Sequence, residues 1–215
     1  MAVVAEAGLR GGLAALELDL TDAQVGQLLA FAELLHKWSR VYNLTALRGA
    51  DEILTHHLLD CLAVIRPLRR HTAGAALRVL DVGAGAGLPG VVMAIACPEL
   101  TVDCVDAVAK KAAFVQQAAA TLALPRLRGV HSRVEDIGGP YDLVTSRAFA
   151  SLSDFVLMSS EALGDGGAWM AMKGKYPEAE VAALPASAEM FHVEQLRVPG
   201  LQAERCLIWL RRQRS

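Results

Sequence analysis

A glycine-rich segment in the middle of the chain constrains the fold more than any other feature. Residues 79–90 read Val-Leu-Asp-Val-Gly-Ala-Gly-Ala-Gly-Leu-Pro-Gly, so an apolar strand passes into a glycine loop and then into the apolar segment Val91 to Ala96. Glycine allows sharp turns and brings bare backbone N–H groups close to a ligand, and the N-terminus of the following helix carries partial positive charge. The segment therefore predicts a loop that binds a nucleotide cofactor.

The same glycines fit more than one cofactor. Gly85-x-Gly87-x-x-Gly90 matches the fingerprint of dinucleotide-binding proteins, although this match is weak by itself because glycine clusters also form ordinary turns. A second apolar strand, Thr101 to Val105, leads to Asp106, whose carboxylate can accept hydrogen bonds from ribose hydroxyls. These features suit NAD and S-adenosylmethionine equally well.

Acidic residues around the loop favour S-adenosylmethionine. Asp81 precedes the glycines, where a carboxylate suits a ligand with an ammonium and a sulfonium group, both of which a dinucleotide lacks. A third strand, near Leu127 to His131, is followed by Val134 and Glu135. There an apolar side chain can pack on an adenine face, and an acidic or backbone group can meet the edge of the base. Together with the carboxylate of Asp106, these positions favour the methyl donor.

Residues 1–72 are expected to form an N-terminal helical cap. Thr21-x-x-Gln24 is a capping box, which marks the start of a helix. Apolar residues follow at the spacing of one helix face: Val25, Leu28, Leu29, Ala32, Leu35 and Trp38. A second helix is expected from about Glu52 to Ile65, with Pro67 ending it.

Residues 73–215 are expected to form a Rossmann-like methyltransferase domain, in one compact unit with the cap. Strands are predicted at residues 77–82, 101–105, 127–131, 141–145 and 168–172, with helices near 110–122 and 151–163, which is the spacing of βαβ units in a parallel sheet. Two more strands, at 191–198 and 206–210, are joined through Pro199-Gly200 and should form an antiparallel hairpin at the sheet edge. This α/β pattern indicates the class I methyltransferase fold, because a dehydrogenase would need a second half or a substrate domain.

Composition adds further limits. The chain has 215 residues, 53% of them hydrophobic, with no apolar run near the roughly 20 residues of a membrane span and no basic flank at its start, so a cytoplasmic protein is expected. Its cysteines, Cys61, Cys97, Cys104 and Cys206, lack paired spacing, which predicts buried free thiols and no metal site. The net charge of −2 still permits a local basic face that binds nucleic acid. We expect a monomer.

Several blocks of sequence between about Leu20 and Leu210 are those of a known family. They are Trp38 with Tyr42-Asn43-Leu44-Thr45, His56-His57-Leu58-Leu59-Asp60, the segment 80–90, Ser132-Arg133-Val134-Glu135 and Ser146-Arg147-Ala148-Phe149-Ala150-Ser151-Leu152. Together they resemble the bacterial RsmG family, formerly called glucose-inhibited division protein B. Relatives often carry Thr and Pro in place of Ala84 and Ala86, and the small side chains here should leave the loop geometry intact.

The resemblance implies an activity, a cofactor and a substrate. It implies that a methyl group passes from S-adenosyl-L-methionine to N7 of a specific guanine in 16S ribosomal RNA, near the decoding centre of the small ribosomal subunit. It also assigns cofactor-binding roles to Gly83, Leu88, Val134, Glu135 and Arg147. Four residues identified above from the sequence pattern complete the expected cofactor site: Asp81, Gly85, Gly87 and Asp106.

The chemistry of this reaction fits the sequence. Guanine N7 carries an unprotonated in-plane lone pair at neutral pH, so it can attack the methyl group in line without a general base. The chain lacks the Asn/Asp-Pro-Pro-aromatic signature of amino-group methylation, and Cys97-Pro98 has the wrong order for cytosine C5 chemistry. Catalysis should therefore rest on orientation. We expect Arg147 to anchor the methionine carboxylate or guanine O6, with no acid–base role.

Basic residues near the expected site are candidates for RNA contacts. Lys173 follows the fifth strand and is a candidate phosphate contact, with Lys110, Lys111 and Arg133 as further candidates. Asn43 is expected either to face the cofactor or the base, or to cap a helix. Three other interpretations remain open at this point: a small-molecule methyltransferase on the same fold, an NAD-dependent oxidoreductase, and a non-enzymatic module that binds RNA or the cofactor.

Overall fold

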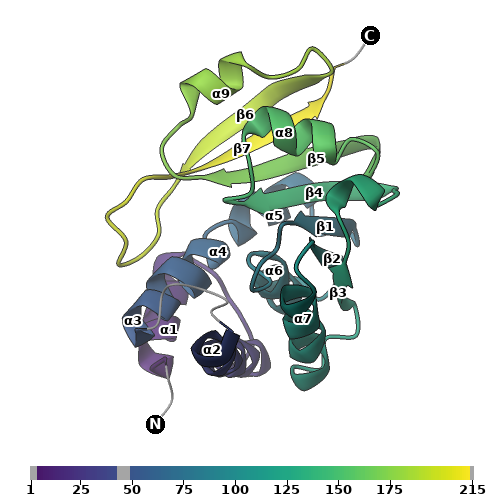
Figure 1. The fold of residues 1–215 in the computed structure, drawn as a ribbon. Coiled ribbons are helices and arrows are strands. Elements are labelled where there is room, and N and C mark those ends of the chain that lie inside the picture. The colour runs from purple at the N-terminus through teal and green to yellow at the C-terminus, as the bar shows by residue number, and fades with distance from the viewer. Residues whose placement is uncertain (1–3, 43–48, 214–215) are drawn as a thin grey trace.

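A seven-stranded sheet in the order β3-β2-β1-β4-β5-β7-β6 forms the centre of the protein (Figure 1). The computed structural model describes residues 4–42 and 49–213. The strands are β1 (Arg78–Val82), β2 (Thr101–Asp106), β3 (Leu127–His131), β4 (Tyr141–Arg147), β5 (Leu163–Lys173), β6 (Ala188–Leu196) and β7 (Arg205–Arg212). The first five strands pair in parallel, and β7 lies antiparallel between β5 and β6.

The predicted parallel sheet with an antiparallel C-terminal hairpin is confirmed. The hairpin differs from the expectation in its connection, because Leu196 pairs with Arg205 and residues 197–204 form a longer loop around the predicted Pro199-Gly200 turn. A Cβ atom on Gly200 would lie 2.9 Å from Cγ2 of Thr55, so this loop packs against the N-terminal helices. The hairpin thereby joins two parts of the chain that are far apart in sequence.

Helices cover both faces of the sheet (Figure 1). They are α1 (Glu6–Ala15), α2 (Asp22–Tyr42), α3 (Ala50–Glu52), a π-helix (Ile53–Leu59), α4 (Asp60–Leu62), α5 (Ile65–Thr72), α6 (Gly90–Ala96), α7 (Ala109–Thr121), a 3₁₀ helix (Val134–Asp136), α8 (Leu152–Met158) and α9 (Glu178–Ala182). None of the helices in residues 4–42 and 49–213 is long and apolar enough to span a membrane.

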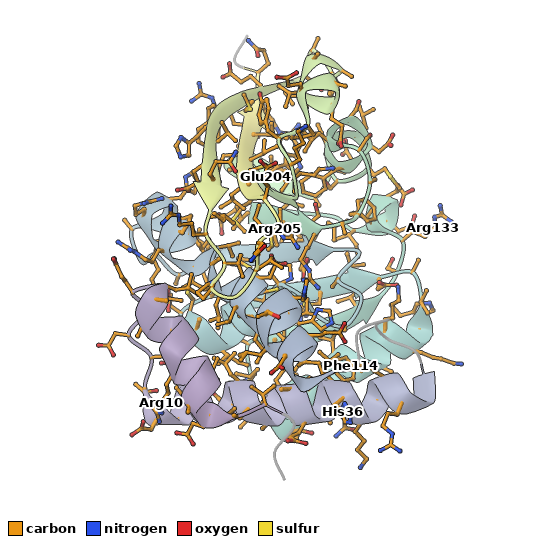
Figure 2. The ribbon with its side chains drawn as sticks, turned by 90° about the vertical axis from the view of Figure 1, so that its left-hand side faces the viewer. Arg10, His36, Phe114, Arg133, Glu204 and Arg205 are labelled. Atoms are coloured by element: carbon orange, nitrogen blue, oxygen red, sulfur yellow. The ribbon has the colours of Figure 1, made fainter. Side chains whose placement is uncertain are left out.

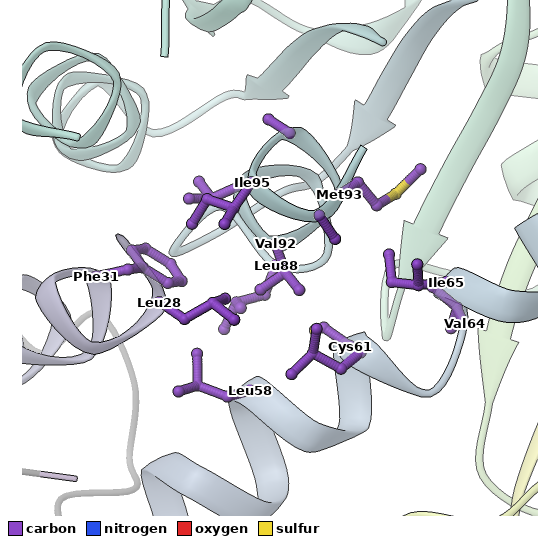
Figure 3. Close-up of a cluster of buried hydrophobic side chains, with 14 of the residues drawn as sticks. Leu28, Phe31, Leu58, Cys61, Val64, Ile65, Leu88, Val92, Met93 and Ile95 are labelled. Atoms are coloured by element: carbon purple, nitrogen blue, oxygen red, sulfur yellow. The ribbon is translucent and has the colours of Figure 1, made fainter. Parts of the chain in front are cut away.

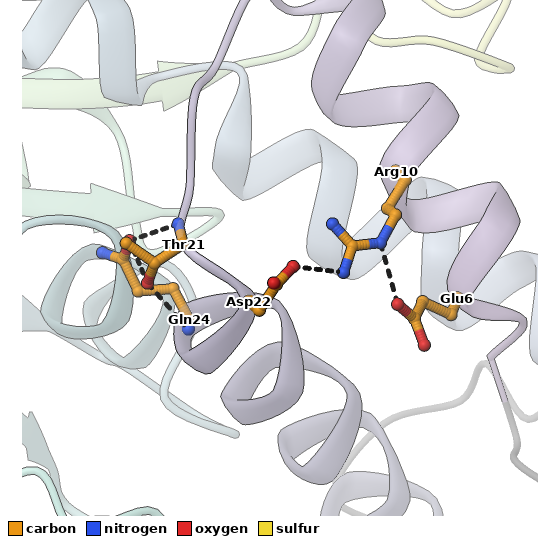
Figure 4. Close-up of polar contacts among 5 residues, drawn as sticks. All are labelled: Glu6, Arg10, Thr21, Asp22 and Gln24. Atoms are coloured by element: carbon orange, nitrogen blue, oxygen red, sulfur yellow. Dashed lines mark hydrogen bonds and ion pairs between the residues drawn. The ribbon is translucent and has the colours of Figure 1, made fainter.

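The start of α2 confirms the predicted capping box (Figure 4). The N–H of Thr21 donates to Oε1 of Gln24 at 3.0 Å, and the N–H of Gln24 donates to Oγ1 of Thr21 at 3.3 Å. Two backbone donors that a helix leaves unsatisfied are thus bonded by side chains. Nε2 of Gln24 in turn donates to the carbonyl of Ile95 at 2.8 Å, so the same residue ties α2 to the end of α6.

The second predicted helix is confirmed over residues 52–62, with a π-helical segment inside it, but its predicted end was wrong. Residues 50–62 form α3, the π-helix and α4 in succession, and Pro67 does not stop a helix but lies in the first turn of α5. Proline is tolerated there because the first N–H groups of a helix have no intrahelical acceptor. The helix predicted at residues 151–163 is also shorter, ending at Met158.

Alternating strand residues build one hydrophobic core on each face of the sheet. On β5, Ala168, Met170 and Met172 contact the core beneath α2, α4, α6 and α7, while Trp169 and Ala171 contact the core beneath α8. Figure 3 shows part of the first core, where Leu28 and Phe31 of α2 and Leu58 and Cys61 lie against Val92 and Ile95 of α6. All four cysteines are free and buried, as predicted.

The N-terminal helices share this first core with the sheet. Leu28, Leu58 and Ile65 belong to the same buried cluster as Val79 of β1 and Val102 of β2. The last of these N-terminal helices ends at Thr72 and the first strand begins at Arg78. The division into a cap over residues 1–72 and a sheet domain over residues 73–215 stays a prediction, because the two parts share this core. The shared core fixes the helices against the edge of the sheet that carries the glycine loop.

Gly90 is the position at which this packing is tightest next to the loop. A Cβ atom there would lie 2.3 Å from Sγ of Cys104 and 2.8 Å from Oδ2 of Asp81. We predict that Gly90→Ala destabilises the protein by about 1–3 kcal/mol, because an added methyl group overpacks a buried site. The measurement is the free energy of unfolding in urea.

A helical glycine in open space provides the matched control. A Cβ atom on Gly26, inside α2, meets nothing within 4 Å. Because alanine favours helices more than glycine does, Gly26→Ala should leave stability unchanged or raise it by up to about 1 kcal/mol. Equal stabilities of the two variants would contradict the packing argument.

Candidate functional site

Two adjoining cavities open at the carboxyl edge of the parallel strands, where ligands bind in such sheets. The first cavity, of about 340 Å³, is lined by Gly83, Val105, Asp106, Ala107, Lys111, Ser132, Arg133, Val134, Glu135, Ala148, Phe149 and Met158. The second, of about 510 Å³, is lined by His56, His57, Asp60, Gly83, Ala84, Gly85, Ala86, Leu88, Arg147, Ala148, Met172, Lys173, Gly174 and Arg205. Gly83 and Ala148 border both, so the cavities meet at these two residues.

The glycine loop bends into these cavities through left-handed backbone conformations. Gly83, Gly85 and Gly87 have φ angles of 63°, 58° and 74°, which side-chain-bearing residues rarely adopt. Gly87 serves packing, because a Cβ atom there would lie 2.4 Å from Cγ2 of Val91. Gly85 has open space at its Cβ position, with only the carbonyl of Gly83 at 3.9 Å. The loop thus borders the cavities at Gly83 and Gly85 and packs against α6 at Gly87.

Asp81 supports the loop from below. Its side chain is completely buried, and Oδ2 accepts a hydrogen bond from the N–H of Gly90 at 2.8 Å. This bond satisfies a backbone donor at the start of α6 and ties the helix to β1. Oδ1 of Asp81 has no hydrogen-bond partner among the residues that the structure describes. Burial without full pairing raises the pKa of this carboxyl to about 7.

Asp106 holds the other side of the loop and borders the first cavity. Its Oδ2 accepts the N–H of Gly85 at 3.0 Å, and its Oδ1 accepts the N–H of Val108 at 2.8 Å. Nζ of Lys111 lies 3.5 Å from Oδ2. Lys111, a predicted RNA contact, therefore lies beside Asp106, the carboxylate predicted to bind ribose hydroxyls. Both residues line the first cavity.

The far wall of the first cavity follows β3. Val134 is buried in the 3₁₀ helix, and Glu135 next to it has a side chain that is 40% exposed. The guanidinium of Arg133 lies 3.7 Å from this carboxylate and is mostly exposed. Phe149 lies over the glycine loop, where a Cβ on Gly83 would meet its ring at 2.4 Å. The first cavity is therefore an apolar slot with acidic and basic groups at its rim.

Arg147 forms the floor of the second cavity at the end of β4. Its Nη1 donates to Oδ2 of Asp60 at 3.0 Å and to the carbonyl of His56 at 2.9 Å. The π-helix makes this carbonyl accessible, because the N–H of Asp60 bonds to the carbonyls of Thr55 and His57. Such π-helical turns are often found at functional sites. Arg147 is thus held in place by the N-terminal helices.

His57 contributes a neutral imidazole to the same cavity. Burial, and then the nearby charge of Arg147, lower the pKa of His57 to about 4. Its ring Nδ1 lies 3.1 Å from the carbonyl of His56. At neutral pH the cavity therefore gains no positive charge from this side chain.

The remaining predicted RNA contacts lie in different surroundings. Nζ of Lys173 borders the second cavity but already donates to the carbonyl of Ala150 and to Oε2 of Glu180, each at 2.8 Å. Lys110 is exposed at the start of α7 and, within the described part of the chain, lies outside both cavity walls. Asn43 lies outside the described residues.

Asp60 and Arg205 are among the residues of the second cavity that sequence reasoning missed. Asp60 stood within the His56–Asp60 block, which was the signal that could have identified it, but it received no role. Arg205 carried no signal, because it is a single arginine at the start of a strand. Its Nε donates to Oδ1 of Asp60 at 2.7 Å. No group of three or more potential metal ligands occurs in residues 4–42 and 49–213.

Comparison with known proteins gives a consistent result. The family model described as rRNA small subunit methyltransferase G matches residues 24–208. Ribosomal RNA small subunit methyltransferase G of Acidovorax ebreus is 61% identical over 214 residues, covering 96% of this chain and 95% of the relative.

Two solved structures share the fold at low sequence identity. Magnesium protoporphyrin IX methyltransferase from Synechocystis, with bound S-adenosylmethionine, superposes with a TM-score of 0.60 at 16% identity over 90% of this chain and 98% of that one. TrmN from Thermus thermophilus has a TM-score of 0.58 at 18% identity, over 74% of this chain and 53% of its own. The fold is therefore that of class I methyltransferases, as predicted.

The buried carboxyl of Asp81 generates a prediction about stability and pH. Its pKa of about 7 exceeds the ordinary value of 3.8, so between these pH values the folded state keeps a proton that the unfolded state has lost. The stability contributed by this proton is complete below about pH 4 and is lost as pH rises toward 7, with a slope of at most about 1.4 kcal/mol per pH unit.

Asp81→Asn isolates this effect, because the amide oxygen can still accept the N–H of Gly90. We predict that the variant gains stability relative to the wild type as pH rises from 5 to 7.5. Urea unfolding of both proteins at several pH values measures this difference. A constant difference across this range would show that Asp81 is ionised throughout.

Proposed function

The chain belongs to the rRNA small subunit methyltransferase G family, and we propose that it transfers the methyl group of S-adenosylmethionine to N7 of a specific guanine in 16S ribosomal RNA near the decoding centre. The family methylates 16S ribosomal RNA with this cofactor. The observation that carries methyl transfer to a base is the pair of cavities that meet at Gly83 and Ala148, because it offers one compartment for the nucleoside of the cofactor and one for the base. The choice of N7 rests on the second cavity, where the carboxylate of Asp60 is already bound by two guanidinium groups.

The residues of the first cavity fit the cofactor. S-adenosylmethionine, when bound, supplies a methyl group activated by a positive sulfur. Asp106 keeps acceptor capacity for ribose hydroxyls, since a carboxylate offers about four lone-pair sites. Val134 and Phe149 supply apolar surface for adenine, and Glu135 stands at the rim.

The glycine loop fits the central part of the cofactor. Gly83 and Gly85 present backbone to the junction of the cavities, and Leu88 borders the second cavity. Oδ1 of Asp81 is a buried acceptor without a partner in the described chain, which suits a nearby ammonium group. Contact between the two remains a prediction, because Asp81 lies beneath the loop. Gly87 supports the loop by packing against α6.

The second cavity suits a reaction that needs no proton removal. The carboxylate of Asp60 is bound by two guanidinium groups, and the low pKa of His57 makes it a weak base. Guanine N7 needs neither as a base, because its lone pair is already available. The neutral His57 also avoids repulsion with the positive charge that the guanine ring acquires. This arrangement supports direct in-line attack driven by orientation.

Arg147 is proposed to anchor the ligands at the junction of the cavities. It lies at the end of β4, beside Val82 and the glycine loop, through the pairing of Ser146 with Val82. Because only Nη1 is engaged in the described structure, Nε and Nη2 are available to donate to the methionine carboxylate or to guanine O6. Its contacts with Asp60 and His56 hold it in position for this role.

The protein is proposed to act on the small ribosomal subunit as a monomer in the cytoplasm, without a metal. Lys111 and Arg133 border the first cavity, and Lys110 is the exposed residue before Lys111 in α7, so these residues remain candidates for RNA phosphates. Lys173 is a weaker candidate, since its ammonium group is already bound to Glu180. Asn43 remains a candidate from sequence.

A direct assay tests the proposed reaction. Purified protein is incubated with methyl-labelled S-adenosylmethionine and small ribosomal subunits from cells that lack the gene, and the RNA is digested to nucleosides. We predict label in 7-methylguanosine. Label in another nucleoside would contradict the choice of N7, and transfer only to small molecules would favour the small-molecule methyltransferase interpretation.

Arg147→Ala tests the anchoring role. We predict that cofactor affinity, subunit affinity or both fall about 10- to 100-fold, because a charge-assisted hydrogen bond contributes about 1.5–3 kcal/mol. Calorimetry of cofactor binding and the KM for subunits separate the two cases. Arg126→Ala is the control, because Arg126 is exposed and donates to the carbonyl of Glu99, outside both cavities. Wild-type values in Arg147→Ala would refute the role.

A further inference from the structure

A single buried carboxylate joins three distant segments beside the second cavity. Asp60, at the start of α4, receives Nη1 of Arg147 at 3.0 Å and Nε of Arg205 at 2.7 Å, one guanidinium on each oxygen. The three side chains are 4%, 21% and 22% exposed. Figure 2 shows Arg205 where the C-terminal hairpin meets the N-terminal helices. The hairpin loop packs on the same helices through Gly200 and Thr55, which fixes the start of β7.

The charges of this group do not balance. One carboxylate faces two arginines, which stay protonated in proteins, so the group carries one positive charge in excess at the cavity wall. Arg205 donates Nε to Asp60 and Nη1 to the carbonyl of Glu204. Its Nη2 has no acceptor among residues 4–42 and 49–213, and neither oxygen of Asp60 is left without a guanidinium. An anion bound at this wall would take up the excess charge.

The order of the strands gives the two arginines different positions. Along the carboxyl edge, the glycine loop follows β1, Arg147 ends β4, Lys173 ends β5 and Arg205 begins β7. Adjacent strands lie about 4.8 Å apart, so Arg147 is about 5 Å from the strand of the glycine loop and Arg205 is about 14 Å from it. Arg147 therefore lies beside the cofactor loop, whereas Arg205 lines the same cavity three strands away from that loop.

We propose that Arg205 binds a backbone phosphate of the RNA strand that carries the target guanine, and that Asp60 is a positioning residue that holds Arg205 and Arg147 at a fixed separation. This proposal rests on the proposed function, because it assigns the RNA side of the same cavity. Guanidinium groups bind phosphate through paired hydrogen bonds, and phosphate contacts set the position of a nucleic acid on a protein. The shared carboxylate then couples the position of the RNA to that of the cofactor site.

Arg205→Gln tests the phosphate contact. The wild type and the variant are compared for the dissociation constant of S-adenosylmethionine and for kcat/KM on unmethylated small subunits over a range of salt concentrations. We expect the variant to bind the cofactor within twofold of the wild type and to show a KM for subunits about tenfold higher. The slope of log kcat/KM against log salt should become shallower by about 0.7–0.9, which is the loss of one phosphate contact.

Arg211→Gln is the matched control. Arg211 lies on the same strand and also donates its Nε to a carboxylate, that of Glu189, but at the opposite end of β7. All three measured values should stay at the wild-type level in this variant. Arg205→Gln with the wild-type salt slope, or with cofactor affinity lowered as much as RNA affinity, would overturn the assignment and leave Arg205 as a brace between β7 and α4.

Asp60→Asn tests the positioning role. The substitution removes the negative charge that holds both guanidinium groups. The dissociation constant of the cofactor and the KM for subunits should therefore both rise, whereas in Arg205→Gln only the KM rises. In the double variant that carries both Asp60→Asn and Arg205→Gln, the fold-increase in KM should be less than the product of the increases in the two single variants. Independent effects would overturn the positioning role.

The failure of this proposal can be distinguished from that of the proposed function. No methyl transfer to the subunit by the wild-type protein would refute the function itself. Transfer by the wild type with an unchanged salt slope in Arg205→Gln would refute only the assignment of Arg205.

Discussion

The hydrogen bond from the N–H of Gly90 to the carboxylate of Asp81 is the contact on which the rest of the site depends. It fixes the start of α6 against the end of β1, so the intervening loop must turn within a few residues. Asp106, from the neighbouring strand, holds the loop at Gly85 from the other side. Two carboxylates on adjacent strands thus shape a glycine loop that would otherwise have many conformations. The loss of entropy on folding is greatest for glycine, which explains why two such anchors are needed.

A group centred on the carboxylate of Asp60 extends this support to the second cavity. Asp60 connects the N-terminal helices to β4 through Arg147 and to the hairpin through Arg205. Breaking a buried ion pair by removing one partner leaves an uncompensated charge, so such a group holds its members in a fixed arrangement. The N-terminal helices therefore do more than cover the sheet. They provide the carboxylate, the His56 carbonyl and the neutral His57 that complete the wall of the second cavity.

The proposed reaction rests on orientation rather than on proton transfer. Methylation of a ring nitrogen with an available lone pair demands that two reactants lie close together and aligned, a condition that can lower a barrier by about 7–11 kcal/mol. Two cavities that meet at Gly83 and Ala148, with rigid strand ends on one side and a packed helical layer on the other, suit this demand. The positive φ of Ala148, 54°, shows that the chain adopts an unfavourable conformation for a non-glycine residue at this junction.

Local patterns in the sequence determined the elements, and tertiary structure decided how distant residues meet. The glycine loop, the capping box of Thr21 and Gln24, the strands and the hairpin could be predicted because their signals lie within a few residues of one another. The role of the π-helix could not be predicted, because it consists in offering the carbonyl of His56 to Arg147, which lies far away in the sequence. Nor could the roles of Asp60 and Arg205, because their contacts span 87 and 145 residues of chain. Only the order of strands brings these charges to one edge, and a single sequence carries no local mark of that order.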